Sequence, residues 1–302
     1  MNQAPPARDG YIDERGKIPQ ALLYVQAYRD RQQLWRTILA MLAGLGALLA
    51  VLFVAAVPVG TALDRLLGVT PFDPAAPSFT VGFWIAGNLL LAALIPTAGL
   101  LQWSIYRQKP RWLSSLAGGF RWRVLGRAAV VIVPLWAAYM VVLQFVMPTG
   151  PIQLTATTIA LSAAAVITVP LQSAGEEYLF RGLLSRAIGA RFRHPAAAFT
   201  VATAVTAVLF GAIHGAVNGW TLAYYIICGV ALSVVAQRTG GLEVAVLVHA
   251  VNNTMLLVPT ILADRLGTLS APSGPVLIIP MAVIALAAAI VWRLAPRITS
   301  PS

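Results

Sequence analysis

The sequence has few charged residues. They make up 10% of its 302 residues, against about 25% in soluble domains, whereas hydrophobic residues make up 59% and the mean hydropathy is +0.79. A chain of this composition cannot cover a globular core with a hydrated surface, so a soluble domain is excluded. Cysteine is almost absent as well. Cys228 is the only one, which excludes a disulfide framework within one chain.

Acidic residues are also scarce: there are ten, against 21 lysines and arginines, and the net charge is +11. Nucleic-acid-binding proteins share such an excess, but they gather it on one basic face. Here the basic residues lie in the tails and in alternate loops between apolar segments, as in membrane proteins. The predicted partner is therefore the lipid bilayer, and no nucleic acid is expected.

Apolar segments dominate the rest of the sequence. A helix needs about 20 residues to cross the hydrocarbon core of a membrane, and such segments can be placed eight times. We therefore predict an all-α fold, a polytopic transmembrane helical bundle of about eight spans. The predicted spans are 38–58, 81–106, 125–146, 155–178, 197–215, 219–238, 242–263 and 275–294.

The distribution of lysine and arginine predicts the orientation of the bundle. With the N-terminus in the cytoplasm, 19 of the 21 lie on the cytoplasmic side, and only Arg65 and Arg265 lie on the other. Because basic loops remain inside, both termini are predicted to be cytoplasmic. The richness in alanine, valine and leucine, with arginine favoured over lysine, is typical of a high-GC bacterium. The expected location is a bacterial plasma membrane.

Two adjacent carboxylates lie within an apolar segment, at Glu176 and Glu177. A charge in the bilayer interior costs at least about 2.5–3.5 kcal/mol on insertion scales, so such residues are rare without a partner and a purpose. Arg181 follows Glu177 by four positions, the favourable order for an ion pair on one helix face. We predict that Arg181 neutralises Glu177 and that Glu176 faces a cavity. The alternative is that all three residues only mark the end of a span.

Two histidines also lie in predicted spans, His214 and His249. For either one alone, a hydrogen bond to a neighbouring helix is an equally good interpretation. Their neighbours favour a shared site, because Asn253 follows His249 by four residues and Phe210 precedes His214 by four. Counted from the nearest cytoplasmic turn, Glu176 lies about 18 Å deep and His214 about 27 Å. This spacing permits the side chains to converge but does not require it.

Together these residue types could hydrolyse an amide or ester bond. Glu176 and a histidine can deprotonate a water molecule, and a second imidazole with the Asn253 carboxamide can stabilise an oxyanion. A divalent metal such as zinc, held by Glu176, His214 and His249, is an open alternative. Other intramembrane hydrolase signatures are missing: there is no H-E-x-x-H motif, no G-x-S-x-G motif and no intramembrane aspartate pair.

Three motifs occur in order on separate spans: E-E-x-x-x-R at 176–181, F-x-x-x-H at 210–214 and H-x-x-x-N at 249–253. Over roughly residues 150–265 the sequence resembles the type II CAAX prenyl endopeptidase and bacteriocin-processing family (CPBP). This family includes the Ras-converting enzymes and bacterial immunity (Abi) proteins. The resemblance implies an intramembrane protease whose substrate is a membrane-associated protein or peptide, with an active cavity that opens toward the cytoplasm.

The resemblance also implies a role for each motif residue. Glu176 and His214 would activate the water, while His249 and Asn253 would form the oxyanion hole. The supporting residues would be Glu177, Arg181 and Phe210. Members of the family are described both as metalloproteases and as metal-free glutamate proteases, and we expect no tightly bound metal here.

Two other classes of function compete with a protease. A non-catalytic membrane scaffold or immunity protein would keep the polar site for structure or for partner binding. A proton or ion transporter would use the carboxylates as a relay, but the sequence shows neither two related halves nor paired broken helices.

The motifs divide the chain into four parts. A cytoplasmic tail with a candidate interfacial helix covers 1–37, and the first three spans cover 38–147. The motif-bearing core of spans four to seven covers 148–265. The last span and a short tail cover 266–302.

Overall fold

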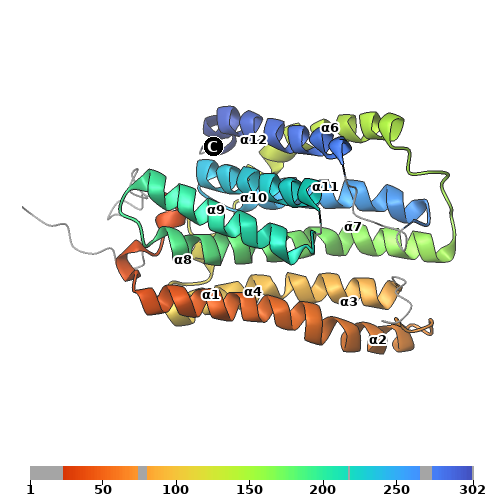
Figure 1. Ribbon diagram of the computed structural model, residues 1–302, viewed down its shortest axis with the longest axis horizontal. Coiled ribbons are helices and arrows are strands. Elements are labelled where there is room, and N and C mark those ends of the chain that lie inside the picture. The colour runs from red at the N-terminus through yellow and green to blue at the C-terminus, as the bar shows by residue number, and fades with distance from the viewer. Residues whose placement is uncertain (1–22, 74–79, 217, 266–273, 301–302) are drawn as a thin grey trace, which may run out of the picture.

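The computed structural model describes residues 23–73, 80–216, 218–265 and 274–300. These residues form an all-helical bundle, and no β-strand occurs among them. The described part contains eight helices that are long and apolar enough to cross a membrane, which confirms the predicted number. The protein is a multi-pass membrane protein. Its first described residues and its C-terminal end lie at the same end of the bundle (Figure 1).

Four of the eight spans are built from consecutive helical pieces. In chain order, their helices are α1 Leu34–Leu49, α2 Ala56–Leu66, α3 Val81–Ala92, α4 Leu94–Tyr106, α7 Ala156–Glu177, α8 Ser185–Gly189 and α12 Ile278–Ile298. A π-helical segment, Ala50–Ala55, joins α1 to α2, and a second, Tyr178–Leu184, joins α7 to α8. The 3₁₀ turn Pro275–Leu277 leads into α12. The single-piece spans are α6 Trp122–Val146, α9 Pro195–Ile213, α10 Gly219–Thr239 and α11 Glu243–Leu262, and α5 Arg111–Ser114 is a short helix between α4 and α6.

Local signals fix where several helices begin and end. The Thr155 side chain caps α7 in a capping box with Thr158, and Pro195 stands at the first position of α9, where a missing N–H is tolerated. Asn218 caps α10 by accepting from the backbone of Thr221. Gly240 ends α10 with φ +66°, a conformation that favours glycine.

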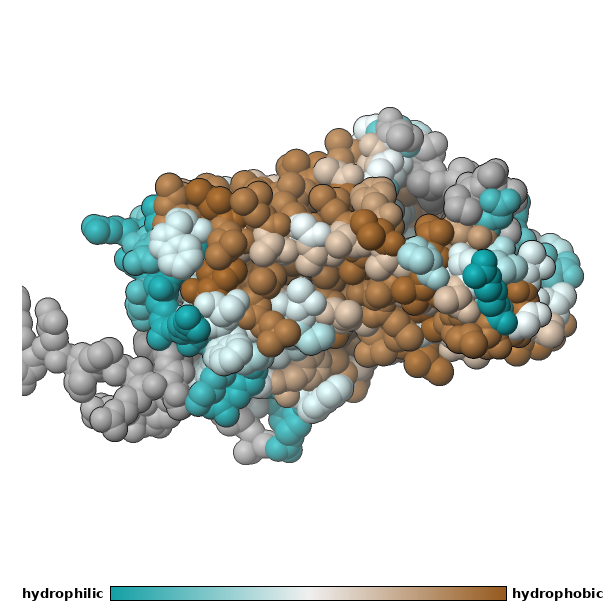
Figure 2. All heavy atoms as spheres, turned by 90° about the horizontal axis from the view of Figure 1, so that it is seen from below, coloured by the Kyte–Doolittle hydropathy of each residue, from teal (hydrophilic) through white to brown (hydrophobic). Residues whose placement is uncertain are grey.

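The outer surface suits a lipid environment. Large apolar side chains face outward along much of the bundle, among them Phe53, Val130, Phe145 and Ile167. The face in Figure 2 is hydrophobic over most of its length, and hydrophilic side chains gather toward its two ends. The span α7 lies at the centre and packs mainly against α11 and α3. One close approach requires Gly175, since a Cβ there would overlap the Leu91 carbonyl group.

The fourth span is longer than the predicted 155–178. Its helix continues through the π segment and α8 to Gly189, because the arginines that suggested a boundary are buried and bonded. Arg181 pairs with Glu177. Arg186 donates to the carbonyl oxygens of Trp112 and Leu113 at 2.7 and 3.2 Å, and its guanidinium lies 3.9 Å from the centre of the Tyr24 ring.

The segment before α1 differs from the predicted interfacial helix. Its described part forms two 3₁₀ turns, Tyr24–Gln26 and Arg29–Arg31, instead of an α-helix. We name residues 24–28 the N-terminal segment. It is buried in the protein, not laid on its surface: Tyr24 donates to the Leu113 carbonyl at 2.7 Å, and Gln26 donates to the Phe192 carbonyl at 2.9 Å. The Val25 amide donates to the Gln237 side chain at 3.3 Å.

Candidate active site

Two adjacent carboxylates end α7, at the point where the π-helical segment begins. Glu176 is 4% exposed and Glu177 fully buried, and Arg181 within the π segment is 2% exposed. Such π turns inside α-helices are frequent at functional sites. The structure therefore holds two carboxylates and one guanidinium inside the bundle, where each needs a partner.

Glu177 is the shared acceptor of the site. Its Oε1 accepts from Arg181 Nη1 at 2.8 Å, which confirms the predicted ion pair along the helix. The same oxygen accepts from His249 Nδ1 at 2.8 Å. Because an ionised carboxylate can only accept, His249 carries its proton on Nδ1. Glu177 thus fixes the orientation of the His249 ring on α11.

One carboxylate oxygen of Glu176 is hydrogen-bonded, and the other has no hydrogen-bond partner among the described residues. Its Oε1 accepts from Gln172 Nε2 at 2.5 Å, one helical turn earlier. Its Oε2 is buried and has no hydrogen-bond partner among the described residues, and His249 Nε2 lies 3.7 Å from it. A buried carboxylate oxygen without a donor is costly. Within the described chain, Glu176 Oε2 is therefore placed to bind a water molecule or a substrate proton.

His214 directly follows the last residue of α9. Its Nδ1 donates to the Phe210 carbonyl at 2.6 Å, so in the neutral ring Nε2 carries the lone pair. The ring stacks on Tyr225 of α10, with centroids 4.1 Å apart and planes 25° apart. Stacking on one side and the backbone bond on the other hold the ring in place.

Phe210 connects the two histidines. Its ring centroid lies 4.5 Å from that of His214 and 5.8 Å from that of His249, and the Arg181 guanidinium lies 4.5 Å from it on the ring face. Arg181 of the π-helical segment, His214 after α9 and His249 of α11 therefore surround one aromatic ring. The helix α9 runs obliquely to α7 (Figure 1).

The two asparagines of α11 bond to different neighbouring helices. Asn253 Nδ2 donates to Ser173 Oγ of α7 at 3.5 Å. Asn252 donates to the Tyr224 hydroxyl at 3.1 Å and accepts from Trp136 at 3.4 Å. Asn253 thus lies on the side of the carboxylates, whereas Asn252 joins α11 to α10 and α6.

Sequence reasoning missed three contacts of this site: Gln172, Ser173 and Tyr225. Gln172 stands four residues before Glu176 and Ser173 four residues before Glu177, so helical spacing from the carboxylates was an available signal. Tyr225 lies on α10, which carries none of the three motifs, and no pattern in the sequence pointed to it.

A cavity of about 600 Å³ reaches the site, with His214, Tyr225 and Asn253 in its wall. The other lining residues come from the C-terminal ends of α6 and α11 and from the N-terminal ends of α10 and α12. Most are apolar, as in typical ligand pockets. Glu176 and His249 lie behind this wall, in the protein interior.

A zinc ion was an open alternative, with Glu176, His214 and His249 as its ligands. No three histidine, cysteine or acidic side chains of the described residues come together as metal ligands do. The His249 Nδ1 atom is already bonded to Glu177. The donor set as it stands does not fit a tetrahedral zinc centre, and no step below is routed through a metal.

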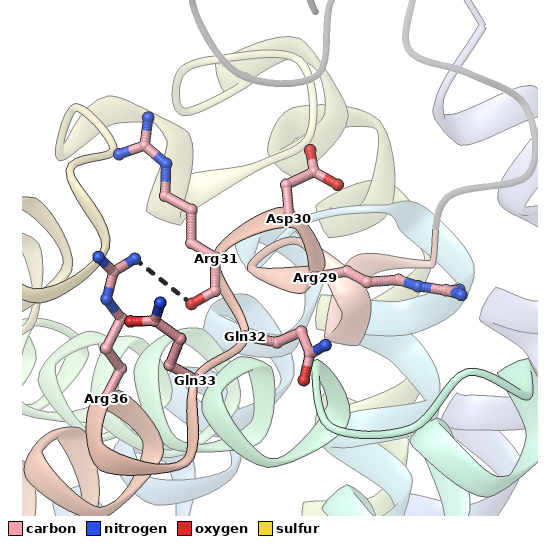
Figure 3. Close-up of a pocket in the computed structure, with 6 residues that line it drawn as sticks. All are labelled: Arg29, Asp30, Arg31, Gln32, Gln33 and Arg36. Carbon is pink, nitrogen blue, oxygen red and sulfur yellow. Dashed lines mark hydrogen bonds between the residues drawn. The ribbon is translucent and has the colours of Figure 1, made fainter.

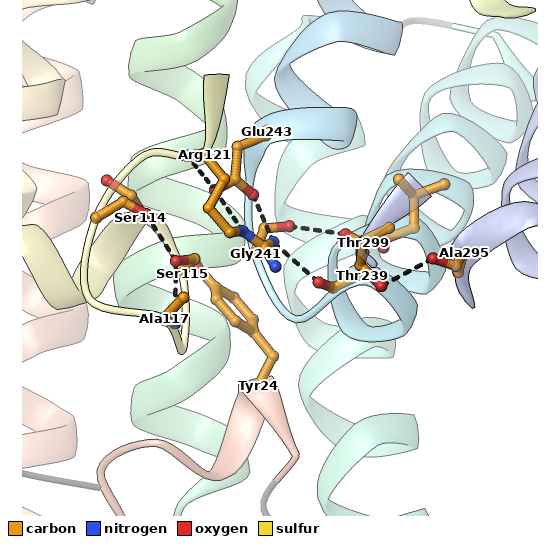
Figure 4. A network of polar contacts seen from close by, with 12 residues as sticks. Tyr24, Ser114, Ser115, Ala117, Arg121, Thr239, Gly241, Glu243, Ala295 and Thr299 are labelled. Carbon is orange, nitrogen blue, oxygen red and sulfur yellow. Dashed lines mark hydrogen bonds and ion pairs between the residues drawn. The ribbon is translucent and has the colours of Figure 1, made fainter. Parts of the chain in front are cut away.

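A second buried ion pair fixes the start of α11 away from the site (Figure 4). Glu243 is fully buried, and its carboxylate accepts from Arg121 Nε at 2.9 Å, from Nη2 at 2.8 Å and from the Arg121 backbone amide at 2.8 Å. The pair anchors the helix that carries His249 and Asn253.

Comparison with known proteins supports the resemblance found in the motifs. Residues 155–255 match the family described as Type II CAAX prenyl endopeptidase Rce1-like, which confirms the predicted family over this segment. The chain is also similar to the uncharacterized protein YyaK of Bacillus subtilis (strain 168), at 35% identity over 102 residues. These are 32% of this chain and 33% of the relative, so the match spans about a third of the relative's length. No solved structure matches the chain significantly.

Proposed function

We propose that this chain, in which residues 155–255 carry the Rce1-like segment, is an intramembrane endopeptidase. It hydrolyses a peptide bond of a membrane-associated protein or peptide with water as the nucleophile. The observation that carries the proposal is the buried Oε2 of Glu176, which has no hydrogen-bond partner among the described residues. The similarity to a Bacillus protein and the composition support a bacterial plasma membrane as its location.

The proposed mechanism assigns water activation to Glu176 and His214. Glu176 Oε2, which has no partner among the described residues, accepts one proton of the water, and the His214 Nε2 lone pair, left free by the Nδ1 bond to Phe210, assists as a second base. General-base catalysis of this kind typically contributes 10²–10⁴-fold. The proton taken from the water then passes to the leaving amine, which completes the hydrolysis.

Stabilisation of the oxyanion falls to His249 and Asn253. Glu177 accepts a hydrogen bond from His249 Nδ1 and fixes the ring, and in the doubly protonated ring Nε2–H can donate to the developing oxyanion. The Asn253 amide supplies a second donor from the same face of α11. Donors held in place before the reaction stabilise the transition state without reorganisation.

The test is cleavage of membrane-anchored peptides by the purified protein in detergent. We expect Glu176→Gln to lower turnover at least about 100-fold while elution volume and melting temperature stay unchanged. Asp30→Asn, the same chemical change on an exposed acidic residue, is the matched control and should keep full turnover. Turnover that survives Glu176→Gln refutes the mechanism.

The same assay separates the remaining interpretations. A non-catalytic scaffold predicts no cleavage by the wild type and a cellular phenotype that Glu176→Gln leaves intact. A metalloprotease predicts that a chelator abolishes turnover and that added zinc restores it.

A further inference from the structure

The cavity beside the candidate site lies toward one end of the bundle. From His214 and Asn253 it extends along α6 and α11 to Met147, Thr149 and Thr260, near the ends of those helices, and to the start of α12. Met147 is 40% exposed at its rim. These helix ends lie opposite the end that holds the first described residues and the C-terminus (Figure 1). We name the end that holds the first described residues and the C-terminus the basic end. We name the opposite end, toward which the cavity extends, the mouth end.

Positive charge gathers at the basic end. Arg29, Arg31 and Arg36 line one pocket there, in which Asp30 is the one acidic residue (Figure 3). Arg31 donates to the Tyr106 carbonyl at 2.6 Å and Arg29 to the Arg193 carbonyl at 3.1 Å, so these bonds hold the guanidinium groups without neutralising them.

This arginine cluster lies at the edge of the apolar surface. Trp35, next to Arg36, is 55% exposed, and Leu34 is 60% exposed at the start of α1. Tryptophan is enriched at the membrane interface, so the guanidinium groups are at the level of lipid headgroups. Among the described residues, the only basic side chains at the mouth end are Arg65 and Arg265.

Two sequence-based expectations conflict in this structure. The distribution of charge places the basic end in the cytoplasm, whereas the family resemblance implies a cavity that opens toward the cytoplasm. The cavity and the basic residues are at opposite ends, so both expectations cannot hold. Each basic residue near an anionic cytoplasmic surface contributes about 1 kcal/mol. Besides the buried Arg181 and Arg186, fourteen described basic residues lie toward the basic end, against Arg65 and Arg265 at the mouth end. The charge distribution decides the orientation.

We infer that the cavity opens to the extracytoplasmic side of the membrane and that the substrate is a peptide segment presented there. This inference rests on the proposed function of the same site. The volume of about 600 Å³ lies in the range of about 300–1,000 Å³ for small-molecule pockets, so it admits an extended segment of a few residues and no folded domain. Apolar Met140, Leu143 and Leu256 line its interior, with Thr149 and Thr260 nearer the rim. Arg265 is a charged residue in the wall. The fitting substrate is a largely apolar stretch of an exported or membrane-anchored peptide.

Cysteine labelling tests the side of the membrane directly. Cys228 is buried and is the only native cysteine, so Cys228→Ala gives a background without thiols. Ile152→Cys places a thiol at the mouth end, where Ile152 is 67% exposed, and Ala117→Cys places one in the exposed loop before α6, at the basic end. With a membrane-impermeant maleimide on intact spheroplasts, we expect Ile152→Cys to react and Ala117→Cys to react only after permeabilisation. The reverse pattern, or reaction of both without permeabilisation, overturns the inference.

Cleavage in sealed vesicles tests access to the site. A quenched fluorescent apolar peptide added outside should be cleaved at least tenfold faster by right-side-out than by inside-out vesicles, and detergent should abolish the difference. Glu176→Gln vesicles should show no cleavage in either orientation. Faster cleavage by inside-out vesicles overturns the sidedness and leaves the proposed function intact. Absence of cleavage even in detergent refutes the proposed function, while the labelling result still decides the orientation.

Discussion

Replacement of Glu177 by glutamine should separate the two roles of this carboxylate. Glu177 Oε1 accepts from both Arg181 and His249 at 2.8 Å, and neither Glu177 nor Arg181 is open to water. A charge-assisted hydrogen bond contributes about 1.5–3 kcal/mol. Removal of one partner of a buried ion pair costs about 3–5 kcal/mol, because the remaining charge stays buried. We therefore expect Glu177→Gln to lower the free energy of unfolding by about 3–5 kcal/mol.

The effect on activity should be larger than the loss of stability explains. His249 loses the anionic partner that fixes the orientation of its ring. In serine proteases, an amide in place of the carboxylate that holds the catalytic histidine lowers kcat about 10⁴-fold. We expect turnover per folded molecule of Glu177→Gln to fall by about 10²–10⁴-fold, measured beside thermal unfolding in the same detergent.

Glu243→Gln is the matched control for this experiment. It removes a second fully buried carboxylate paired with an arginine at 2.8 Å, on the same helix α11. Arg121 is 24% exposed and can regain water, so the loss of stability should be smaller, and turnover per folded molecule should remain. If Glu177→Gln destabilises the protein but retains turnover as Glu243→Gln does, the assigned role of Glu177 in orienting His249 is refuted.

Two further predictions concern packing and the N-terminal segment. Gly175→Ala should lower the melting temperature in detergent, because the added methyl group overlaps the Leu91 carbonyl and overpacking costs about 1–3 kcal/mol or more. Gly126→Ala has no atom within 4 Å of its new Cβ and should leave the melting temperature unchanged. Equal effects of the two substitutions would contradict the packing described. Burial raises the pKa of the Tyr24 hydroxyl above its ordinary value, so stability should fall as the pH rises above about 10, where the unfolded chain ionises first. Tyr24→Phe should weaken that fall in pH-dependent unfolding, and an unchanged pH profile would show that Tyr24 does not contribute to it.

Much of the site could be predicted because it is built from short-range spacing on helices. Glu177 and Arg181 lie one turn apart on the fourth span, so their ion pair follows from helical geometry. The different neighbours of Asn252 and Asn253 follow from the same periodicity, which turns adjacent side chains by about 100°. The eight spans follow from the length of the apolar segments.

Features that depend on long-range packing were beyond the sequence. The burial of Arg186 relies on carbonyl groups of residues more than 70 positions away, so the chain gave no sign that the fourth span continues to Gly189. The stacking of Tyr225 on His214 depends on how α10 packs beside α9. The end at which the cavity opens depends on which helices diverge, which no local pattern encodes.

The N-terminal segment has a consequence for how the chain is made. Tyr24, Val25 and Gln26 are synthesised well before their partners Leu113, Gln237 and Phe192. At about 5–20 residues per second, the ribosome reaches Gln237 roughly 10–40 s after Val25. By then six of the eight spans have been synthesised. The segment can complete its contacts only after Gln237 in the sixth span has been made, so it finishes folding long after it is synthesised and closes the basic end of the bundle.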